Sequence, residues 1–162
     1  MNSIDPNPGR AAHRLYCHFV WPTLGRIPLI STDAAAALER HVITLCRRLD
    51  AEPICVRAFT DRLHLLLRLK PSHAPGTLVA RLKAGTEGAL QAAGHTVRWG
   101  RGYAVATVSG AEVRSVMRRI HRLGEGRMGP ALPRELRPRR RRRDGSVRRP
   151  PRGVVDALPP GR

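Results

Sequence analysis

Residues 61–69, DRLHLLLRL, form the stretch that most limits what this chain can fold into. Side chains of a β-strand point to opposite faces in turn, so one face would carry Leu63, Leu65, Leu67 and Leu69. The other face would carry Arg62, His64, Leu66 and Arg68. Residues two apart point the same way, which is how paired histidines on one strand chelate a metal, but here only the second is histidine. The stretch predicts a half-buried strand and favours a solvated or hydrogen-bonded His64.

The net charge is extreme for a chain of 162 residues, a length that suits one domain with its own core. The formal charge is +18 and the isoelectric point is about 11.7. Such a charge favours a polyanionic partner, with nucleic acid ahead of an acidic membrane surface. Arginine supplies nearly all of the positive charge. Because a guanidinium group can bind phosphate through two hydrogen bonds, the arginines favour nucleic acid further.

The cysteines and the lengths of the apolar segments indicate in which cellular compartment the protein works. Cys17, Cys46 and Cys55 are odd in number and include no Cys-x-x-Cys pair, so neither a disulfide framework nor a zinc ribbon is indicated. The N-terminus lacks the apolar core of a signal peptide, and no apolar run approaches the ~20 residues of a membrane span. We therefore expect a cytoplasmic protein with no membrane partner.

The first half of the chain predicts a strand, a helix and a hairpin. Residues 14–21 alternate and Pro22 ends this strand, whose inner face would carry Leu15, Cys17, Phe19 and Trp21. Ser31 or Thr32 can cap a helix that begins at Asp33. The apolar stripe of this helix consists of Leu38, Val42, Leu45 and Leu49. Residues 54–59 form a strand that turns through 60–61 into the leucine-rich strand.

The second half predicts a helix over 76–93, weakened by Gly85 and Gly88, and a strand over 104–108. A third helix follows Ser109 and Gly110. Its apolar stripe is the cleanest in the chain: Val113, Val116, Met117, Ile120 and Leu123. Basic side chains lie away from that stripe: Arg114, Arg118, His121 and Arg122. For this basic face, solvation and phosphate contact remain equally open.

The composition divides the chain into three parts. Residues 1–12 read as a flexible leader, and residues 13–123 form the domain. Residues 124–162 hold 12 arginines against four acidic residues, a net of +8 by subtraction, and seven of the 14 prolines, so they cannot bury a core. We expect a disordered basic tail. Its uninterrupted arginine run is a candidate non-specific polyanion contact: Arg139, Arg140, Arg141, Arg142 and Arg143.

The order strand, helix, strand, strand, helix, strand, helix predicts an α+β ferredoxin-like sandwich with an antiparallel sheet. In this fold the first and third strands are neighbours at the centre of the sheet. If their apolar faces both meet the helices, the uncovered face carries Tyr16, His18, Arg62, His64 and Arg68. Such a face suits single-stranded nucleic acid, with charge dominating because only 4% of the residues are aromatic.

Residues 13–123 resemble a known family in four pieces taken in order: HRLYCHFVW followed by RIPLI, FTDRLHLLLRL, LVARLK, and WGRGYAVATVS. The second piece stands where the family has Asp-His-hydrophobic-His-Leu-Leu. The last stands where it has Trp, Gly-Tyr and a Thr-Val-Ser-like strand. The family is that of the one-tyrosine transposases of single-strand insertion sequences, which includes the transposases associated with repetitive extragenic palindromes.

The resemblance implies a DNA-cutting activity that this chain is poorly equipped to perform. The family joins a tyrosine covalently to a 5′ phosphate of single-stranded DNA, aided by a divalent metal such as magnesium or manganese on two histidines. The second of these histidines matches His64, whereas the first falls on Arg62. The positions of the tyrosine and of a glutamine in the third helix fall on Arg119 and Leu123. The resemblance also implies single-stranded or hairpin DNA as partner, and a homodimer.

We therefore expect a transposase-family DNA-binding protein that has lost strand cleavage and uses no cofactor. Two alternatives stay open: a metal-dependent nuclease with a rewired site in which His18 joins His64, and an RNA-binding ferredoxin-like module. Any metal site would be a remnant at His64. The candidate nucleic-acid-binding residues are Tyr16, His18, Arg62, His64, Arg68, Lys83, Arg118, Arg122 and the run Arg139–Arg143.

Overall fold

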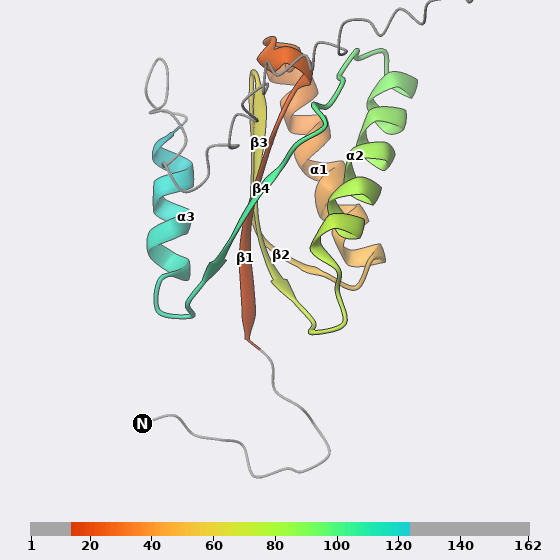
Figure 1. The fold of residues 1–162 in the computed structure, drawn as a ribbon. Helices are drawn as coiled ribbons and strands as arrows, with labels where there is room; N and C mark the ends of the chain where they lie inside the picture. Colours follow the sequence, from red (N-terminus) through yellow and green to blue (C-terminus); the bar gives the residue numbers. More distant parts are fainter. Residues whose placement is uncertain (1–13, 124–162) are drawn as a thin grey trace, which may run out of the picture.

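A computed structural model describes residues 14–123 as one four-stranded sheet with helices on both faces (Figure 1). The predicted leader, the predicted tail and its arginine run Arg139–Arg143 lie outside the described residues. Within that range no helix is both long and apolar enough to cross a membrane. The elements in chain order are β1 (Leu15–Pro22), a 3₁₀ turn (Leu24–Arg26), α1 (Thr32–Arg48), β2 (Glu52–Phe59), β3 (Arg62–Leu69), α2 (Pro75–Ala92), β4 (Ala104–Val108) and α3 (Val113–Arg122).

The sheet has the strand order β2-β3-β1-β4, and every neighbouring pair is antiparallel. The predicted ferredoxin-like α+β fold is confirmed, with β1 and β3 at the centre. Between these two strands His18 pairs with Leu66 and Val20 pairs with His64. His18 and His64 are therefore diagonal neighbours on one face of the sheet.

The main core lies between the sheet and the layer formed by α1 and α2, on the right of Figure 1. As predicted, β3 contributes Leu63, Leu65, Leu67 and Leu69, and β1 contributes Cys17, Phe19 and Trp21. The prediction was wrong for Leu15, which is 37% exposed. Leu15 opens β1 at the far end of the sheet, opposite Leu69. Its alternation places it on the inner face, but the end of a strand lies beyond the helices that cover that face.

The helices begin and pack much as their sequences predict. The Ser31 hydroxyl oxygen accepts a hydrogen bond from the Ala34 amide at 3.2 Å, so Ser31 caps α1, which begins one residue earlier than expected. α2 continues through both of its glycines. At Gly85 a Cβ atom would lie 2.8 Å from Leu45 Cδ1, so the missing side chain allows α1 and α2 to lie close together.

The face of the sheet opposite α1 and α2 is covered by α3, which corrects the expectation that this face is uncovered (Figure 1). Val116 and Ile120 of α3 are buried against Leu66 of β3 and Cys55 of β2, as a second, smaller core. An apolar stripe as clean as that of α3 must be removed from water, and this sheet face is the surface on which it packs. The covered face is therefore no open platform for stacking bases.

Candidate nucleic-acid interface

Two buried histidines occupy the centre of the face that α3 covers. His18 and His64 are 4% and 3% exposed, and His18 Nε2 lies 3.2 Å from His64 Nδ1. Arg62 donates a hydrogen bond from Nε to His64 Nε2, also at 3.2 Å. Because an arginine nitrogen can only donate, His64 Nε2 must be unprotonated, and the His64 proton must sit on Nδ1. The bond then runs from His64 Nδ1 to His18 Nε2, so both ring nitrogens of His64 are engaged.

Burial keeps both histidines neutral at pH 7. Loss of hydration on burial lowers the pKa of His18 to about 4, with Arg119 adding to the effect. Burial likewise lowers the pKa of His64 to about 3, assisted by His18, Arg62 and Arg119. Arg119 is thus close enough to influence both imidazoles, although its own side chain is exposed on α3. The positive charge at this site comes from the arginines.

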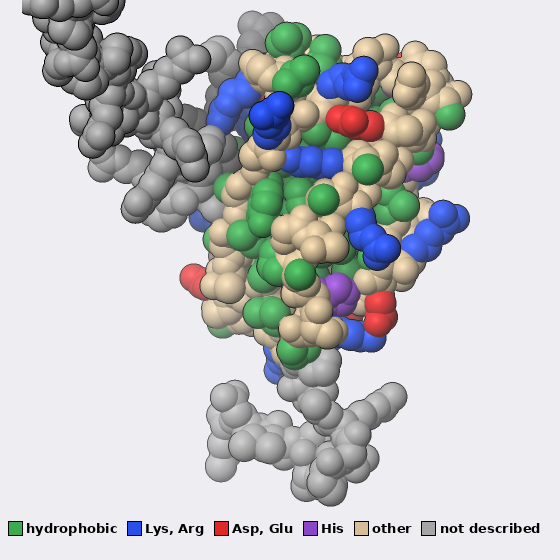
Figure 2. Space-filling model, turned by 45° about the vertical axis from the view of Figure 1, so that its right-hand side comes forward, with side chains coloured by type: hydrophobic (Ala, Val, Ile, Leu, Met, Phe, Trp, Pro, Cys, Tyr) green, Lys and Arg blue, Asp and Glu red, His purple; other side chains and the backbone are tan. Residues whose placement is uncertain are grey.

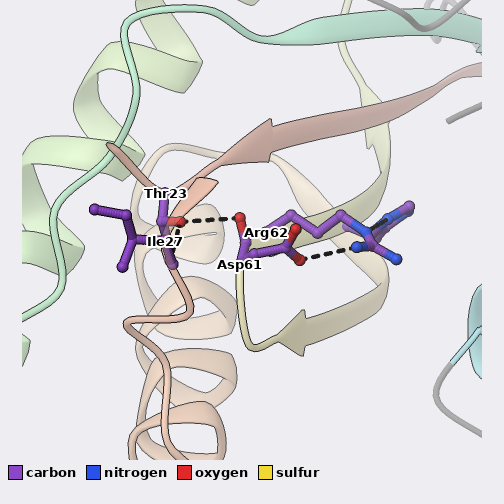
Figure 3. A network of polar contacts seen from close by, with 5 residues as sticks. Thr23, Ile27, Asp61 and Arg62 are labelled. Atoms are coloured by element: carbon purple, nitrogen blue, oxygen red, sulfur yellow. Dashed lines mark hydrogen bonds and ion pairs between the residues drawn. The ribbon is translucent and has the colours of Figure 1, made fainter. Parts of the chain in front are cut away.

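Arg62 is held in place on three sides. Its guanidinium forms an ion pair with Asp61 at 2.8 Å and lies 5.0 Å from the centre of the Phe59 ring. The Asp61 backbone is fixed in turn by buried Thr23, whose hydroxyl lies 3.1 Å from the Asp61 carbonyl oxygen (Figure 3) and whose amide donates to the same oxygen at 2.8 Å. The Arg62 side chain is only 18% exposed, so it is packed into the site and does not extend freely into solvent.

The residues present do not fit the divalent metal that the family resemblance implies. His64 has no ring nitrogen left for a metal, and the adjacent position on the strand carries the Arg62 cation. Each pair of like unit charges ~4 Å apart costs roughly 4 kcal/mol at an effective dielectric near 20. Within residues 14–123 there is no group of three His, Cys, Asp or Glu side chains that could hold a metal ion. The rewired alternative meets the same obstacle, because His18 and His64 are brought together as a hydrogen-bonded pair.

The outer face of α3 is the most concentrated positive surface near the histidines. Its arginines are exposed, and none forms an ion pair with another residue of the described range: Arg114, Arg118, Arg119 and Arg122. A hollow of about 450 Å³ is lined by Ser115, Arg118, Arg119, Arg122 and Leu123. Unpaired guanidinium groups around one hollow suit an anion with several acceptor oxygens, such as phosphate.

The remaining candidate residues are scattered. Tyr16 is half-buried beside Gly110, just before α3. Arg68 is exposed on β3 and forms an ion pair with Glu52. Lys83 lies on α2, across the sheet from α3, where its ammonium group donates to the carbonyls of Gly100 at 2.7 Å and Gly102 at 2.9 Å. The structure brings Arg118 and Arg122 together with Arg119, and His18 together with Arg62 and His64, but it separates Lys83 from both groups.

Sequence reasoning noted Arg119 only as the position of a missing nucleophile, and it did not note Ser115 as part of an anion site. The signal was present in the apolar stripe of α3. That stripe had to pack on something, and the free face of the sheet was the available surface. Once α3 is placed there, the charge of Arg119, next to buried Ile120, lowers the pKa values of both histidines.

Comparison with known proteins agrees with this architecture. The family described as "Transposase IS200 like" matches residues 11–122, well over half of the chain. The chain therefore belongs to the IS200-like transposase family. None of the proteins with curated descriptions matches it.

Solved structures with a similar fold include two transposases. A candidate transposase from Deinococcus radiodurans R1 superposes with a TM-score of 0.58 at 23% identity, over 72% of this chain and 96% of that one. A REP-associated tyrosine transposase bound to a REP hairpin superposes with a TM-score of 0.50 at 14% identity, over 71% of this chain and 70% of that one. At these identities the likeness supports the fold.

Proposed function

We propose that this protein binds DNA, as single strands or hairpins, and does not cut it. The observation that carries the proposal is the state of His64. Both of its ring nitrogens are engaged, one by Arg62 and one by His18, so it has none to offer a metal. Arg119 stands where the family resemblance implies a tyrosine, and it adds positive charge to the same site.

The case for DNA rests on family membership and on charge. The chain carries +18 and belongs to a family of transposases, and one solved structure with this fold is described as bound to a REP hairpin. On α3, Arg114, Arg118 and Arg122 are four residues apart. With a rise of about 1.5 Å per residue, their Cα atoms follow one side of the helix at roughly 6 Å intervals. A row of this kind can follow the phosphates of a nucleic-acid backbone.

The case against cleavage rests on the nucleophiles. Tyr16 is half-buried beside Gly110, and Tyr103 lies before β4, on a loop that Lys83 ties to α2. Ser115 on α3 donates its hydroxyl hydrogen bond to the Glu112 carbonyl at 3.1 Å. The nearest histidine on that helix, His121, has its Nε2 atom 3.8 Å from Cys55 Sγ and so faces β2. In residues 14–123 neither tyrosine nor Ser115 therefore forms a hydrogen bond to a side chain that could take its proton. The Ser109 hydroxyl does donate to the Glu112 carboxylate at 2.8 Å, but Ser109 lies before α3, away from the position where the family resemblance implies the nucleophile.

Salt-dependent binding of a DNA hairpin tests the assigned surface. The triple variant Arg118→Gln/Arg119→Gln/Arg122→Gln is compared with Arg40→Gln/Arg47→Gln/Arg48→Gln, which removes the same charge from exposed positions of α1. If each α3 arginine contacts one phosphate, the slope of log K against log salt becomes shallower by about 2 for contacts to single-stranded DNA and by about 3 for contacts to the duplex stem. The α1 variant should keep the wild-type slope.

Two results would contradict the proposal. Equal loss of binding in both triple variants would mean that total charge matters and that α3 is not the interface. A clear preference for an RNA hairpin of the same sequence would favour the RNA-binding alternative. Binding of either hairpin needs no metal under this proposal, so the same measurements in EDTA should give the same affinities.

A further inference from the structure

A second surface of mixed character lies where two loops meet, beyond the end of β1. It consists of Leu24, Arg26 and Ile27 from the β1–α1 loop and Arg98 and Arg101 from the α2–β4 loop, and we call it the loop corner. Leu24 and Ile27 are each 54% exposed, more than any other large hydrophobic residue in the described range. Figure 2 shows basic and hydrophobic side chains, with an acidic side chain among them, over the upper end of the molecule.

The two loops are joined into one rigid unit. The Leu24 amide donates to the Arg98 carbonyl at 2.8 Å, and the Gly100 amide donates to the Pro22 carbonyl at 2.9 Å. Between these bonds Thr23 pairs with Trp99 as a β-bridge. A Cβ atom at Gly100 would lie 3.3 Å from the Thr23 carbonyl oxygen, so the loops approach as closely as glycine permits. The corner keeps its shape through contacts between residues far apart in the sequence.

The exposed tip of this unit is held in an unfavourable backbone conformation. Gly25 has a φ of 65° and Arg26 a φ of 59°, in the left-handed region that side chains other than glycine disfavour. The turn persists because the Arg26 amide donates to the Thr23 carbonyl at 3.0 Å and the Thr23 hydroxyl lies 2.6 Å from the Ile27 carbonyl. Leu24 and Ile27 are therefore held out into water by a fixed turn.

The charge around the two apolar side chains is positive. Arg26, Arg98 and Arg101 are exposed, and none forms an ion pair with another residue between 14 and 123. The acidic group that bonds to this region, Glu87, accepts a hydrogen bond from the Trp99 amide at 2.6 Å. The surface thus offers two exposed apolar side chains and three exposed arginines on one pair of bonded loops. It complements a ligand with an apolar planar face between negative charges.

We propose that the loop corner receives an unpaired or terminal base of the bound DNA, with Leu24 and Ile27 against the base and the three arginines on the flanking phosphates. The inference rests on the proposed DNA-binding function. Apolar wedges of this kind unstack bases in other DNA-binding proteins. The corner is also anchored to the β2–β3 hairpin, because buried Thr23 bonds to Asp61, the ion-pair partner of Arg62.

The test uses the whole protein and hairpin DNA with 2-aminopurine as the unpaired base beside the stem. A blunt duplex of the same stem is the second ligand. Leu24→Ser/Ile27→Ser is compared with Leu15→Ser/Val105→Ser, which changes two other exposed hydrophobic residues. Equal melting temperatures establish that both variants fold.

Wild-type protein and the Leu15→Ser/Val105→Ser control should raise the 2-aminopurine fluorescence. With Leu24→Ser/Ile27→Ser the fluorescence should not rise, and hairpin binding should be weaker by roughly tenfold. Affinity for the blunt duplex should not change.

Three outcomes would overturn the inference. If wild-type protein binds the hairpin and the corner variant keeps both affinity and fluorescence, the loop corner has no such role, although the proposed function stands. If neither DNA binds the wild-type protein, the proposed function fails and the inference fails with it. If the corner variant loses binding to vesicles containing phosphatidylglycerol but keeps its DNA affinity, the loop corner is a membrane contact.

Discussion

Mild acid should destabilise this domain through its two buried histidines. Each has a folded-state pKa below its ordinary value of 6.5, about 4 for His18 and about 3 for His64, so the unfolded chain binds protons that the folded one excludes. The contribution of the two neutral histidines to the free energy of unfolding is therefore present in full above pH 6.5 and is lost as the pH falls toward 4. When the pH falls from 7 to 5, each histidine lowers the free energy of unfolding by about 2 kcal/mol, and the pair lowers it by about 4 kcal/mol.

A loss of this size is large against a typical domain stability of about 5–15 kcal/mol. It corresponds to a fall in melting temperature of roughly 15 °C or more for a domain of this length. Asp50 and Glu112 contribute little between pH 7 and pH 5, because hydrogen bonds from Lys70 and Ser109 hold the pKa values of these two carboxyl groups below their ordinary range.

The assay is thermal unfolding followed by circular dichroism at pH 7 and pH 5. The double variant His18→Gln/His64→Gln keeps polar side chains at both positions and should lose most of the pH dependence. The matched control is His41→Gln, because His41 is exposed on α1 and bonds only to the Ala37 carbonyl of its own helix. Equal melting temperatures at the two pH values in wild-type protein, or an unchanged shift in the double variant, would refute the neutral buried pair.

Two further predictions concern metal and packing. Titration calorimetry with manganese should give no stoichiometric binding that disappears in His64→Ala, and such binding would refute the interpretation that Arg62 and His18 occupy the nitrogens of His64. Gly88→Ala, with nothing within 4 Å of the added Cβ, should stabilise α2 by up to about 1 kcal/mol in urea unfolding. Gly85→Ala places its Cβ 2.8 Å from Leu45 Cδ1 and should be less stable than Gly88→Ala by about 1 kcal/mol or more. Equal stability of the two variants would mean that α1 and α2 are not tightly apposed.

Much of the fold could be predicted because its information is local. The alternating leucines of β3, the Ser31 cap and the helical stripe of α1 each depend on neighbours within a few residues. The order of these elements then allowed few topologies, so the adjacency of β1 and β3 followed. The site was less predictable, because the apolar stripe shows only that α3 is buried, and the free face of the sheet becomes the available surface only once α1 and α2 are placed on the other face. The loop corner could not be predicted at all, since its shape depends on bonds between Leu24 and Arg98 and between Gly100 and Pro22.

The difference between local and long-range information also explains how much of the histidine pair could be predicted. Sequence alternation placed His18 and His64 on the correct face, but their burial depends on α3, and their hydrogen bond depends on the register of β1 against β3. Arg62 was recognised as a misfit for a metal site. That its Nε atom donates to His64 depends on the Asp61 ion pair and the Phe59 ring, which are fixed only in the folded hairpin.

The most direct test of the central claim is a search for a covalent protein–DNA adduct. The protein is incubated with single-stranded hairpin DNA and manganese, denatured, and separated by electrophoresis. Binding without cleavage predicts a complex in native gels and no adduct after denaturation. The variant Arg62→His/Arg119→Tyr/Leu123→Gln should form some adduct if the family correspondence is right. An adduct formed by the wild-type protein, and lost in Tyr16→Phe or Tyr103→Phe, would contradict the account and identify an active enzyme with a rewired site.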